Sequence, residues 1–380
     1  MSKYDFSMDF YKGKKVLVTG HTGFKGTWMC RMLIGAGAIV TGYALEAGDN
    51  GMDEACTTDC GKPSLFKLAD VEKYMTSVVG DIRDLAHMQK VFDEAQPEIV
   101  IHMAAQPIVR DSYKSPVYTY ETNVMGTVNV LECVRNTKSV KSFVNVTTDK
   151  VYLNKEWSWG YRENEEINGY DPYSNSKSCS ELVTSSYKNS FFNEADENAR
   201  KCAISTARAG NVIGGGDFAN DRIIPDCVRS MEKAEEIIVR NPYSTRPFQF
   251  VLEPVYCYLM LAAAQYEDAS FAGNYNVGPD DCDCVTTGQL VDLFCEKWNG
   301  FYEENDKAVR ASWKNVCDHG PHEAGFLKLD CSKIKATFGW APHWHIDEAI
   351  EKIVEWTDCY FNGGDIPAVM DKEIEEFLRA

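Results

Sequence analysis

Short apolar segments rich in β-branched residues recur along the first half of the chain, and longer, more polar stretches separate them. The segments are KVLVTG at 15–20, AIVTGYAL at 38–45, SVVGDI at 77–82, EIVIHMAA at 98–105, SFVNVTT at 142–148 and AISTARAGNVIG at 203–214. Such alternation is typical of βαβ units and a parallel sheet. Runs such as VLV and IVI lack the polar alternation of a half-exposed strand, so we expect helices on both faces. The sequence therefore predicts an α/β fold with a doubly wound parallel sheet.

The composition of the chain changes after about residue 210, and Pro, Arg and aromatic residues are frequent between 222 and 254. Beyond them, 288–298 and 346–361 carry apolar residues at the spacing of three to four that predicts amphipathic helices. We therefore expect a first domain at 1–210 and a smaller α/β part at 211–380. The boundary is soft, and the chain can cross back over it.

Charge restricts the possible partners. The chain has 57 acidic and 39 basic residues, a formal net charge of −18, and no run of five or more Lys or Arg. Such a balance disfavours nucleic acid and anionic membrane surfaces as partners. An anionic small molecule would need a few cations gathered locally.

The 14 cysteines are scattered mostly singly, without a CxxC pair. This usage is typical of a reduced, cytoplasmic protein, and we expect no metal site. No segment approaches the roughly 18 consecutive apolar residues of a transmembrane helix, so we expect no membrane association.

The first strand runs directly into a glycine-rich turn in KVLVTGHTGFKGTW. Gly20 permits the tight turn, Gly23 lets the backbone approach a diphosphate, and Gly26 allows close helix packing. Thr22 and Phe24 lie in the same turn, and the following helix would offer its N-terminal N–H groups. The spacing is GxxGxxG rather than GxGxxG, and a purely structural turn is the alternative. In its place on the first strand, the motif predicts a Rossmann-type site for a dinucleotide.

The choice between NAD and NADP depends on the end of the second strand. Glu46 could bind the adenosine ribose there, although it falls late, and no Arg is nearby to hold a 2′-phosphate. NAD is therefore favoured. Asp81 and Ile82 follow the third strand, where the adenine would lie, but Asp81 could equally be a helix N-cap.

Tyr173 and Lys177 are four residues apart at the start of a predicted helix, which places them on one helical face. A lysine and a cationic nicotinamide ring near the phenol would lower its pKa and let it accept a proton from a sugar hydroxyl. Thr148, at the end of the preceding strand, could hydrogen-bond the same hydroxyl. Asp149 and Lys150 follow it, and without this context they would suggest only a surface salt bridge.

These residues together resemble the extended short-chain dehydrogenase/reductase family, over essentially the whole chain. The longer motifs GHTGFKGTW, GDIRDL, HMAAQPIVR, NVMGT, DPYSNSK and RAGNVIGGGD resemble those of CDP-glucose 4,6-dehydratases in particular. The resemblance implies an NAD-dependent lyase that converts CDP-D-glucose to CDP-4-keto-6-deoxy-D-glucose and water. It also implies a homodimer or higher homo-oligomer, paired through the helix after HMAAQ and the helix that bears Tyr173.

The same resemblance implies roles for individual residues. Asp149 matches the acid that protonates the departing hydroxyl. Lys150 stands where dTDP-glucose relatives carry glutamate, and acts either as the base or as an electrostatic stabiliser. Ala104 and Ala105 of HMAAQ would lie against the cofactor.

Further residues are candidates for the substrate's diphosphate and base: Asn211, Arg222, Arg246, His322 and Glu323. Arginine suits phosphate because its planar fork binds two oxygens at once. Phe248 and Phe250 depart from the family pattern RPWQHVLEP, which puts strict nucleotide preference in question.

Other functions stay open from the sequence alone. One is a 4,6-dehydratase or a 4-epimerase for another nucleotide hexose, although an epimerase does not need an acid beside Thr148. The other is a noncatalytic NAD-binding protein, which would be expected to have lost Tyr173 or Lys177.

Overall fold

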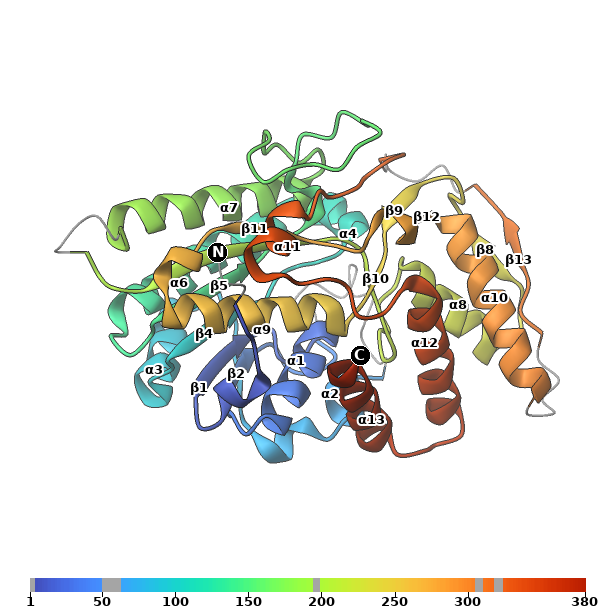
Figure 1. The fold of residues 1–380 in the computed structure, drawn as a ribbon, viewed down its shortest axis with the longest axis horizontal. Coiled ribbons are helices and arrows are strands. Elements are labelled where there is room, and N and C mark those ends of the chain that lie inside the picture. Colours follow the sequence, from blue (N-terminus) through green and yellow to red (C-terminus); the bar gives the residue numbers. More distant parts are fainter. Residues whose placement is uncertain (1–3, 50–62, 194–198, 305–309, 318–323) are drawn as a thin grey trace.

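Seven parallel strands form the central sheet of the computed structural model, which describes residues 4–49, 63–193, 199–304, 310–317 and 324–380. The strand order is β11-β6-β5-β4-β1-β2-β3 (Figure 1). The strands are β1 (Lys15–Thr19), β2 (Ile39–Ala44), β3 (Thr76–Val79), β4 (Ile99–His102), β5 (Ser142–Val146), β6 (Ala203–Ala209) and β11 (Asn274–Val277). The predicted α/β class with a doubly wound parallel sheet is confirmed.

Helices cover both faces of this sheet. On one face lie α1 (Phe24–Gly35) and α9 (Leu252–Glu267), and on the other lie α3 (Leu85–Ala95), α6 (Gly126–Asn136) and α7 (Pro172–Phe191). Along β1, Val16 and Val18 pack into the core with α1 and α9, whereas Leu17 packs into the core with α3 and α6. Successive side chains of a strand point to opposite faces. The uninterrupted apolar runs in the sequence therefore contribute side chains to two hydrophobic cores, one on each face of the sheet.

A second group of elements stands beside the sheet, on the right in Figure 1. The predicted helices at 288–298 and 346–361 are confirmed as α10 (Thr287–Glu304) and α12 (Ile346–Phe361). Around them lie short strand pairs and helices: β7 (Val212–Ile213), β8 (Ile237–Val239), β9 (Thr245–Pro247), β10 (Gln249–Phe250), β12 (Cys284–Thr286), β13 (Trp313–Asn315), α8 (Ile223–Glu232) and α13 (Ile366–Arg379).

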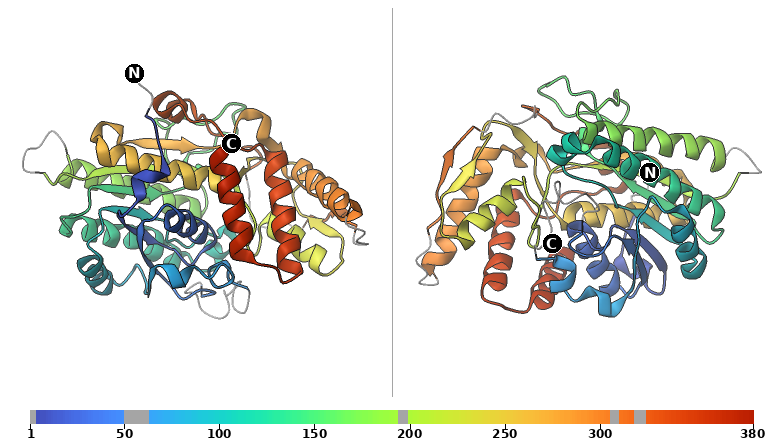
Figure 2. Two further views of the ribbon diagram at one scale, coloured as in Figure 1. Left: turned by 60° about the horizontal axis from the view of Figure 1, so that its bottom comes forward. Right: turned by 180° about the vertical axis from the view of Figure 1, so that it is seen from behind.

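The chain crosses the predicted boundary near residue 210 in both directions. After β6 it forms β7 to β10 beside the sheet, then returns as α9 and β11, and leaves again for α10 and α12. The strand β11 pairs with β6, so the later part of the chain supplies one edge of the large sheet. The final helix, α13, packs against α1, as the left view of Figure 2 shows.

Further helices in the described residues include α2 (Leu65–Leu68), α4 (Val109–Lys114), α5 (Pro116–Tyr120), the π-helix η4 (Glu121–Met125), the short 3-10 helix η5 (Asp149–Val151) and α11 (Ser332–Phe338). Helices α4, α5 and η4 pack beside α7. Among the described residues, no helix is both long and apolar enough to cross a membrane.

Candidate active site

The carboxyl ends of β1, β4, β5 and β6 lie at one edge of the sheet, where parallel α/β folds place their ligands. The turn after β1 needs glycine for two physical reasons. Gly20 has a φ of +76°, and a Cβ there would lie 2.8 Å from the Ala104 nitrogen after β4. A Cβ on Gly26 would lie 2.1 Å from the Gly20 carbonyl oxygen, so only glycine lets α1 start this close to the strand.

The N-terminus of α1 fits a dinucleotide diphosphate. Gly23 is its N-cap and supplies no side-chain cap, and a Cβ there would meet only the Gly20 oxygen, at 3.4 Å. The first N–H groups of the helix therefore face space without a side chain in front of them. The Thr22 hydroxyl donates to the Leu45 carbonyl oxygen at 3.0 Å, which fixes this turn against the end of β2. The Phe24 ring lies against Gly214 of the glycine-rich loop after β6.

Asp81 and Ile82 follow β3, as predicted, but Asp81 is not a helix cap. Asp84 caps α3, through its side chain and the His87 N–H. The Asp81 carboxylate accepts bonds from the Arg83 guanidinium, with Nη2 at 2.7 Å, and from the Arg83 N–H at 2.8 Å. Although burial raises the pKa of Asp81, Arg83 holds it below its ordinary value. The N-cap alternative is therefore wrong, because the Asp81 carboxylate bonds Arg83, two residues later in the chain, and Asp84 is the cap.

The other predicted cofactor residues line the same edge. Ile82 is buried and leaves no room for a Cβ on Gly126 of α6. The Ala104 N–H donates to the Thr19 hydroxyl at 3.2 Å, and Ala105 follows it, half-buried. Glu46 is exposed just beyond β2.

Thr148, Asp149 and Tyr173 come together beyond β5. The Thr148 hydroxyl donates to Asp149 Oδ1 at 2.9 Å, and it also hydrogen-bonds the Tyr173 phenol. Asp149 is fully buried, and its Oδ2 has no hydrogen-bond partner within the described structure. Buried polar atoms are rarely left unpaired, so this oxygen is a natural contact for a ligand.

Lys150 and Asn211 meet across the sheet edge. Lys150 Nζ donates to Asp149 Oδ1 at 3.0 Å and to Asn211 Oδ1 at 3.1 Å. The side chain of Lys150 is 28% exposed, against 0% for that of Asp149. The pair is therefore not a solvated surface salt bridge, the alternative that the two residues would suggest without their context.

Tyr173 and Lys177 both lie near the start of α7, as predicted, and burial shifts their pKa values in opposite directions. Burial raises the pKa of Tyr173 to about 12, and the hydrogen bond between Tyr173 and Thr148 only partly opposes this rise. Lys177 is buried, donates to the Val146 carbonyl oxygen at 3.2 Å, and has its pKa lowered to about 8 by burial. The predicted lowering of the phenol pKa involves a cationic nicotinamide ring as well as the lysine, and it stays a prediction.

Two of the predicted substrate residues, Arg222 and Arg246, lie in different surroundings. Arg222, the N-cap residue of α8, donates to Asp217 Oδ2 at 2.9 Å and acts electrostatically on Tyr173, so it lies near that phenol. Arg246 of β9 is buried and donates to the backbone oxygens of Thr245 and Ala324. His322 and Glu323 lie outside the described residues.

The two positions that depart from the family pattern are interior. Phe248 and Phe250 are both buried, and the Phe250 ring packs 5.1 Å from the ring of Trp344 and 6.2 Å from that of Trp28. The change from imidazole to phenyl at Phe250 therefore adds to an aromatic cluster.

Sequence reasoning missed Lys25. It is the second residue of α1, and its charge interacts with Lys177, Arg222, Asp149 and Lys150. Its Nζ lies 6.0 Å from the ring centroid of Tyr258. A signal was present in the sequence, because a lysine in the first turn of a helix opposes the helix dipole.

A buried ion pair connects α7 with β6. Arg208 Nη2 and Glu181 Oε2 are 2.9 Å apart, with side-chain exposures of 0% and 2%. Glu181 also accepts from the hydroxyls of Thr147 and Thr206, and it partly offsets the lowering of the Lys177 pKa. The pair therefore joins α7 to the ends of β5 and β6.

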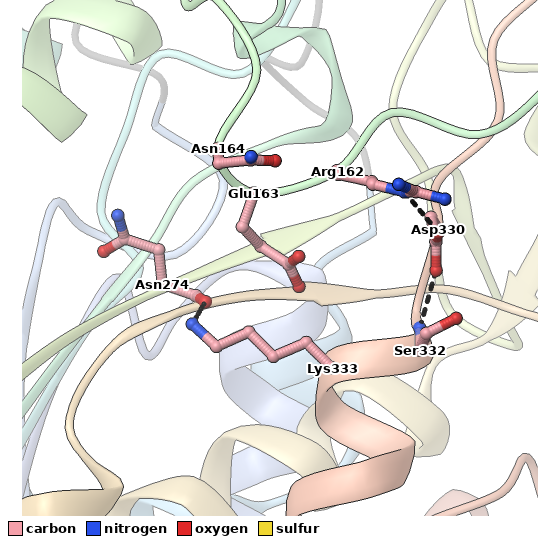
Figure 3. Close-up of a pocket in the computed structure, with 7 residues that line it drawn as sticks. All are labelled: Arg162, Glu163, Asn164, Asn274, Asp330, Ser332 and Lys333. Carbon is pink, nitrogen blue, oxygen red and sulfur yellow. Dashed lines mark hydrogen bonds and ion pairs between the residues drawn. The ribbon is translucent and has the colours of Figure 1, made fainter.

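A pocket of about 470 Å³ opens elsewhere, between the loop after β5 and the start of α11 (Figure 3). Its charged groups are engaged within the protein: Arg162 Nε bonds Asp330 Oδ2 at 3.0 Å, and Lys333 Nζ donates to the Asn274 carbonyl oxygen at 2.7 Å. Glu163 accepts from the Asn276 N–H at 2.9 Å. Among the described residues, those that line this pocket include none of the predicted site residues.

The described residues also bring the potential metal ligands Cys282, Asp283 and His345 within 4.8 Å of one another. Asp283 already bonds His345 Nδ1 at 2.8 Å and the Ile346 N–H at 3.0 Å. Asp283 and His345 therefore form hydrogen bonds that stabilise the start of α12.

Comparison with known proteins agrees with this geometry. The chain matches the model of the family "GDP-mannose 4,6 dehydratase" over residues 17–353. It is 47% identical over 373 residues to a CDP-glucose 4,6-dehydratase of Salmonella typhimurium, covering 98% of each chain. Its fold resembles that of a dTDP-glucose 4,6-dehydratase of Bacillus anthracis in complex with NAD, with a TM-score of 0.70, 18% identity, and 93% and 99% of the two chains covered.

The fold is similarly close to that of a UDP-glucose 4-epimerase of Thermotoga maritima with UDP-glucose, at a TM-score of 0.71, 20% identity, and 91% and 99% coverage. The predicted membership in the extended short-chain dehydrogenase/reductases is confirmed, and the chain belongs to the GDP-mannose 4,6 dehydratase family within them.

Proposed function

We propose that the protein is an NAD-dependent CDP-glucose 4,6-dehydratase, which converts CDP-D-glucose to CDP-4-keto-6-deoxy-D-glucose and water. The observation that carries the reaction type is the buried Asp149 with its unpartnered Oδ2, beside a threonine that bonds the Tyr173 phenol. A 4-epimerase has no hydroxyl to expel and no use for such an acid. The preference for CDP is supported by the 47% identity to the Salmonella enzyme.

The turn after β1 would hold the cofactor, with its diphosphate over the N-terminus of α1. Bound NAD would supply a reversible hydride acceptor for carbon 4 of the glucose. The absence of a positively charged partner for a 2′-phosphate near Glu46 in the sequence supports NAD over NADP.

Tyr173 would take the proton of the hydroxyl at carbon 4. The phenol is a poor base while its pKa is about 12. A cationic nicotinamide ring at this site would lower that pKa, because a nearby positive charge favours the phenolate. Thr148 would hold the same hydroxyl in place.

The loss of water would involve the two residues after Thr148. Asp149 would give a proton from Oδ2 to the hydroxyl that leaves carbon 6, while its Oδ1 stays fixed by Thr148 and Lys150. The ketone at carbon 4 makes the proton on carbon 5 acidic. Lys150, which contacts Asn211, would either take this proton or stabilise the enolate while the proton passes to another base.

The test is to incubate the purified protein with CDP-glucose and to compare it with dTDP-, GDP- and UDP-glucose. We expect a 4-keto-6-deoxy sugar, detected by its absorbance in alkali and by the loss of one water in the mass spectrum, fastest from CDP-glucose. Formation of the 4-epimer without water loss would overturn the proposal. A faster reaction of another nucleotide would overturn the preference for CDP and leave the reaction type intact.

We also propose a homodimer formed through α4, α5, η4 and α7. Large apolar side chains on these neighbouring helices are exposed in the single chain, among them Tyr113, Val117, Met125 and Leu182. Pairing would remove them from water. Sedimentation of Val117→Glu with Leu182→Glu should show a monomer where the unchanged protein sediments as a dimer; a monomer in both cases would contradict the assignment.

Cytoplasmic localisation is part of the same proposal. It is supported by the described cysteines, which are free thiols.

A further inference from the structure

The buried carboxylate of Glu181 joins three elements of the protein. Glu181 lies on α7 and binds Arg208 of β6, with Oε1 at 3.0 Å from Nε and Oε2 at 2.9 Å from Nη2. Its Oε2 also accepts from the Thr206 hydroxyl of β6 at 2.8 Å, and its Oε1 accepts from the Thr147 hydroxyl at 2.5 Å. The Glu181–Arg208 ion pair therefore contacts the residue that directly precedes the segment 148–150.

Thr147 lies between two residues that contact the predicted pair Tyr173 and Lys177. The Val146 carbonyl oxygen accepts from Lys177 Nζ at 3.2 Å, and the Thr148 hydroxyl bonds the Tyr173 phenol. The Thr147 N–H donates to a carbonyl oxygen of β6 at 2.9 Å, so its backbone connects to the sheet. Its hydroxyl connects to α7, the helix that bears both members of the pair.

The same ion pair contacts the chain on the other side of the segment. Tyr152 directly follows η5, the short helix that contains Asp149 and Lys150. The buried Tyr152 hydroxyl accepts from Arg208 Nη1 at 2.9 Å and donates to Asn276 Oδ1 of β11 at 2.6 Å. The Arg208 guanidinium also lies 5.1 Å from the centroid of the Tyr152 ring. The segment 148–150 is thus attached at both ends to one buried pair of charges.

This attachment matters because the strand pairing of β5 with β6 ends at Val146, before the segment begins. Misplacement of a reacting group by about 1 Å can lower a rate by about 100-fold. Hydrogen bonds to a charged group are stronger and shorter than those between neutral groups, so they hold a side chain more firmly. Removal of the Thr147 hydroxyl would delete one such bond while Glu181 and Arg208 keep each other as counter-ions. Thr147 is therefore the position at which placement can be separated from stability.

We propose that Thr147 and Tyr152 are positioning residues, through which the Glu181–Arg208 ion pair fixes the segment between them for reaction. The inference rests on the proposed dehydratase function. Thr147 acts on hydride removal at carbon 4, because the next residue, Thr148, bonds the phenol that takes the proton. Tyr152 acts on the loss of water, because it anchors the short helix that carries the acid. Neither side chain itself gives or takes a proton in the reaction.

Two substitutions of Thr147 separate its hydroxyl from its shape. Thr147→Val keeps the shape and removes the hydroxyl, whereas Thr147→Ser keeps the hydroxyl and removes a methyl group. In a single turnover with CDP-glucose, the absorbance of reduced nicotinamide reports hydride removal, and mass spectrometry of quenched samples reports the loss of water. Thr357→Val is the matched control, because Thr357 is also buried and its hydroxyl donates to a carbonyl oxygen within α12 at 2.7 Å. Thermal unfolding, the KM for CDP-glucose and the NAD dissociation constant are measured for every variant.

We expect Thr147→Val to form reduced nicotinamide about 10-fold more slowly, with an unchanged KM for CDP-glucose and unchanged NAD binding. Thr147→Ser should restore most of the rate, and Thr357→Val should be normal. A residue that only filled space would give the opposite order, because valine fills the site better than serine. Tyr152→Phe should slow the loss of water by about 10-fold and hydride removal by less, so that reduced nicotinamide accumulates.

A normal rate in Thr147→Val, or a rate in Thr147→Ser that is equally low, would contradict the positioning role. Equal slowing of both steps in Tyr152→Phe would contradict the assignment of that residue to the loss of water. Thermal unfolding identifies a variant that does not fold, and the two Thr147 variants then decide the proposal. If the unchanged enzyme bound CDP-glucose but neither reduced its cofactor nor released water, the proposed function itself would be wrong, and these roles with it.

Discussion

Three consecutive side chains at the end of β5 would have three different chemical roles in the proposed reaction. Thr148 bonds both the Tyr173 phenol and Asp149, Asp149 is sealed from water, and Lys150 reaches across to Asn211. Since successive side chains leave a strand end in different directions, one short segment would contact both the carbon-4 hydroxyl and the carbon-6 hydroxyl under the proposed function. The division of labour can be tested because the two steps have separate signals.

Asp149→Asn should leave hydride removal intact and slow the loss of water by about 100-fold or more. Asparagine keeps an oxygen that can accept from Thr148 and Lys150, but it has no acidic proton to give. Reduced nicotinamide should therefore accumulate during a single turnover with CDP-glucose. Tyr173→Phe is the complementary variant and should form none; equal loss of both steps in Asp149→Asn would contradict the separation of roles.

At the scale of elements, α7 is more than a platform for Tyr173 and Lys177. One turn beyond Lys177, Glu181 binds Arg208 of β6 through two nitrogens, Nε at 3.0 Å and Nη2 at 2.9 Å. Arg208 in turn donates to the Tyr152 hydroxyl at 2.9 Å, close after the catalytic segment. This ion pair thus connects the helix to the strand. An intact buried pair contributes little net stability, but removing one of its partners strongly destabilises the protein.

Glu181→Gln should lower the free energy of unfolding by about 3–5 kcal/mol, because it leaves the Arg208 charge buried without a counter-ion. Chemical denaturation of the two proteins measures this difference. Glu303→Gln, in the exposed pair with Arg310, is the control and should change stability very little. A similarly small effect of Glu181→Gln would mean that Arg208 finds another anion or water.

At the scale of the whole molecule, Glu253 joins the sheet layer to the elements beside it. It stands in the first turn of α9, and its Oε1 accepts from the N–H groups of His343 and Trp344, each at 2.8 Å, just before α12. Its Oε2 is buried without a partner in the described structure. Burial raises the pKa of Glu253 to about 8, although the two backbone bonds oppose the rise.

This carboxyl should make the protein less stable as the pH rises. Between the unfolded value of 4.5 and the folded value of about 8, the folded state binds more protons than the unfolded state. Stability therefore decreases with rising pH through that window and levels off above it. Thermal unfolding should show that Glu253→Gln is less sensitive to pH between 6 and about 8; an unchanged slope would assign the effect to other groups.

The sequence was most informative where a pattern has one physical cause. The six apolar runs all contain strands, because a strand buried on both faces has few other compositions; the edge strand β3, whose residues are exposed or half-buried, is the exception. Tyr173 and Lys177 lie on the predicted helix, where a spacing of four residues places both side chains on one face. Strand β11, NYNV, escaped prediction because it is short and half polar and is identified by its pairing with β6. The contact of Lys150 with Asn211 and the environment of Lys25 also required the fold, since their partners are distant in sequence.

The place of β11 at the edge of the sheet has a consequence for biosynthesis. Every residue of β6 is buried in the finished protein, yet its partner strand begins only at Asn274, after an excursion that builds four strands elsewhere. A nascent chain that has just released β6 from the ribosome therefore carries an open, apolar strand edge until β11 and α9 arrive. Such an edge attracts other chains. Pauses in translation between the codons for β6 and β11 should consequently be the point at which a growing chain is most prone to aggregate or to engage a chaperone.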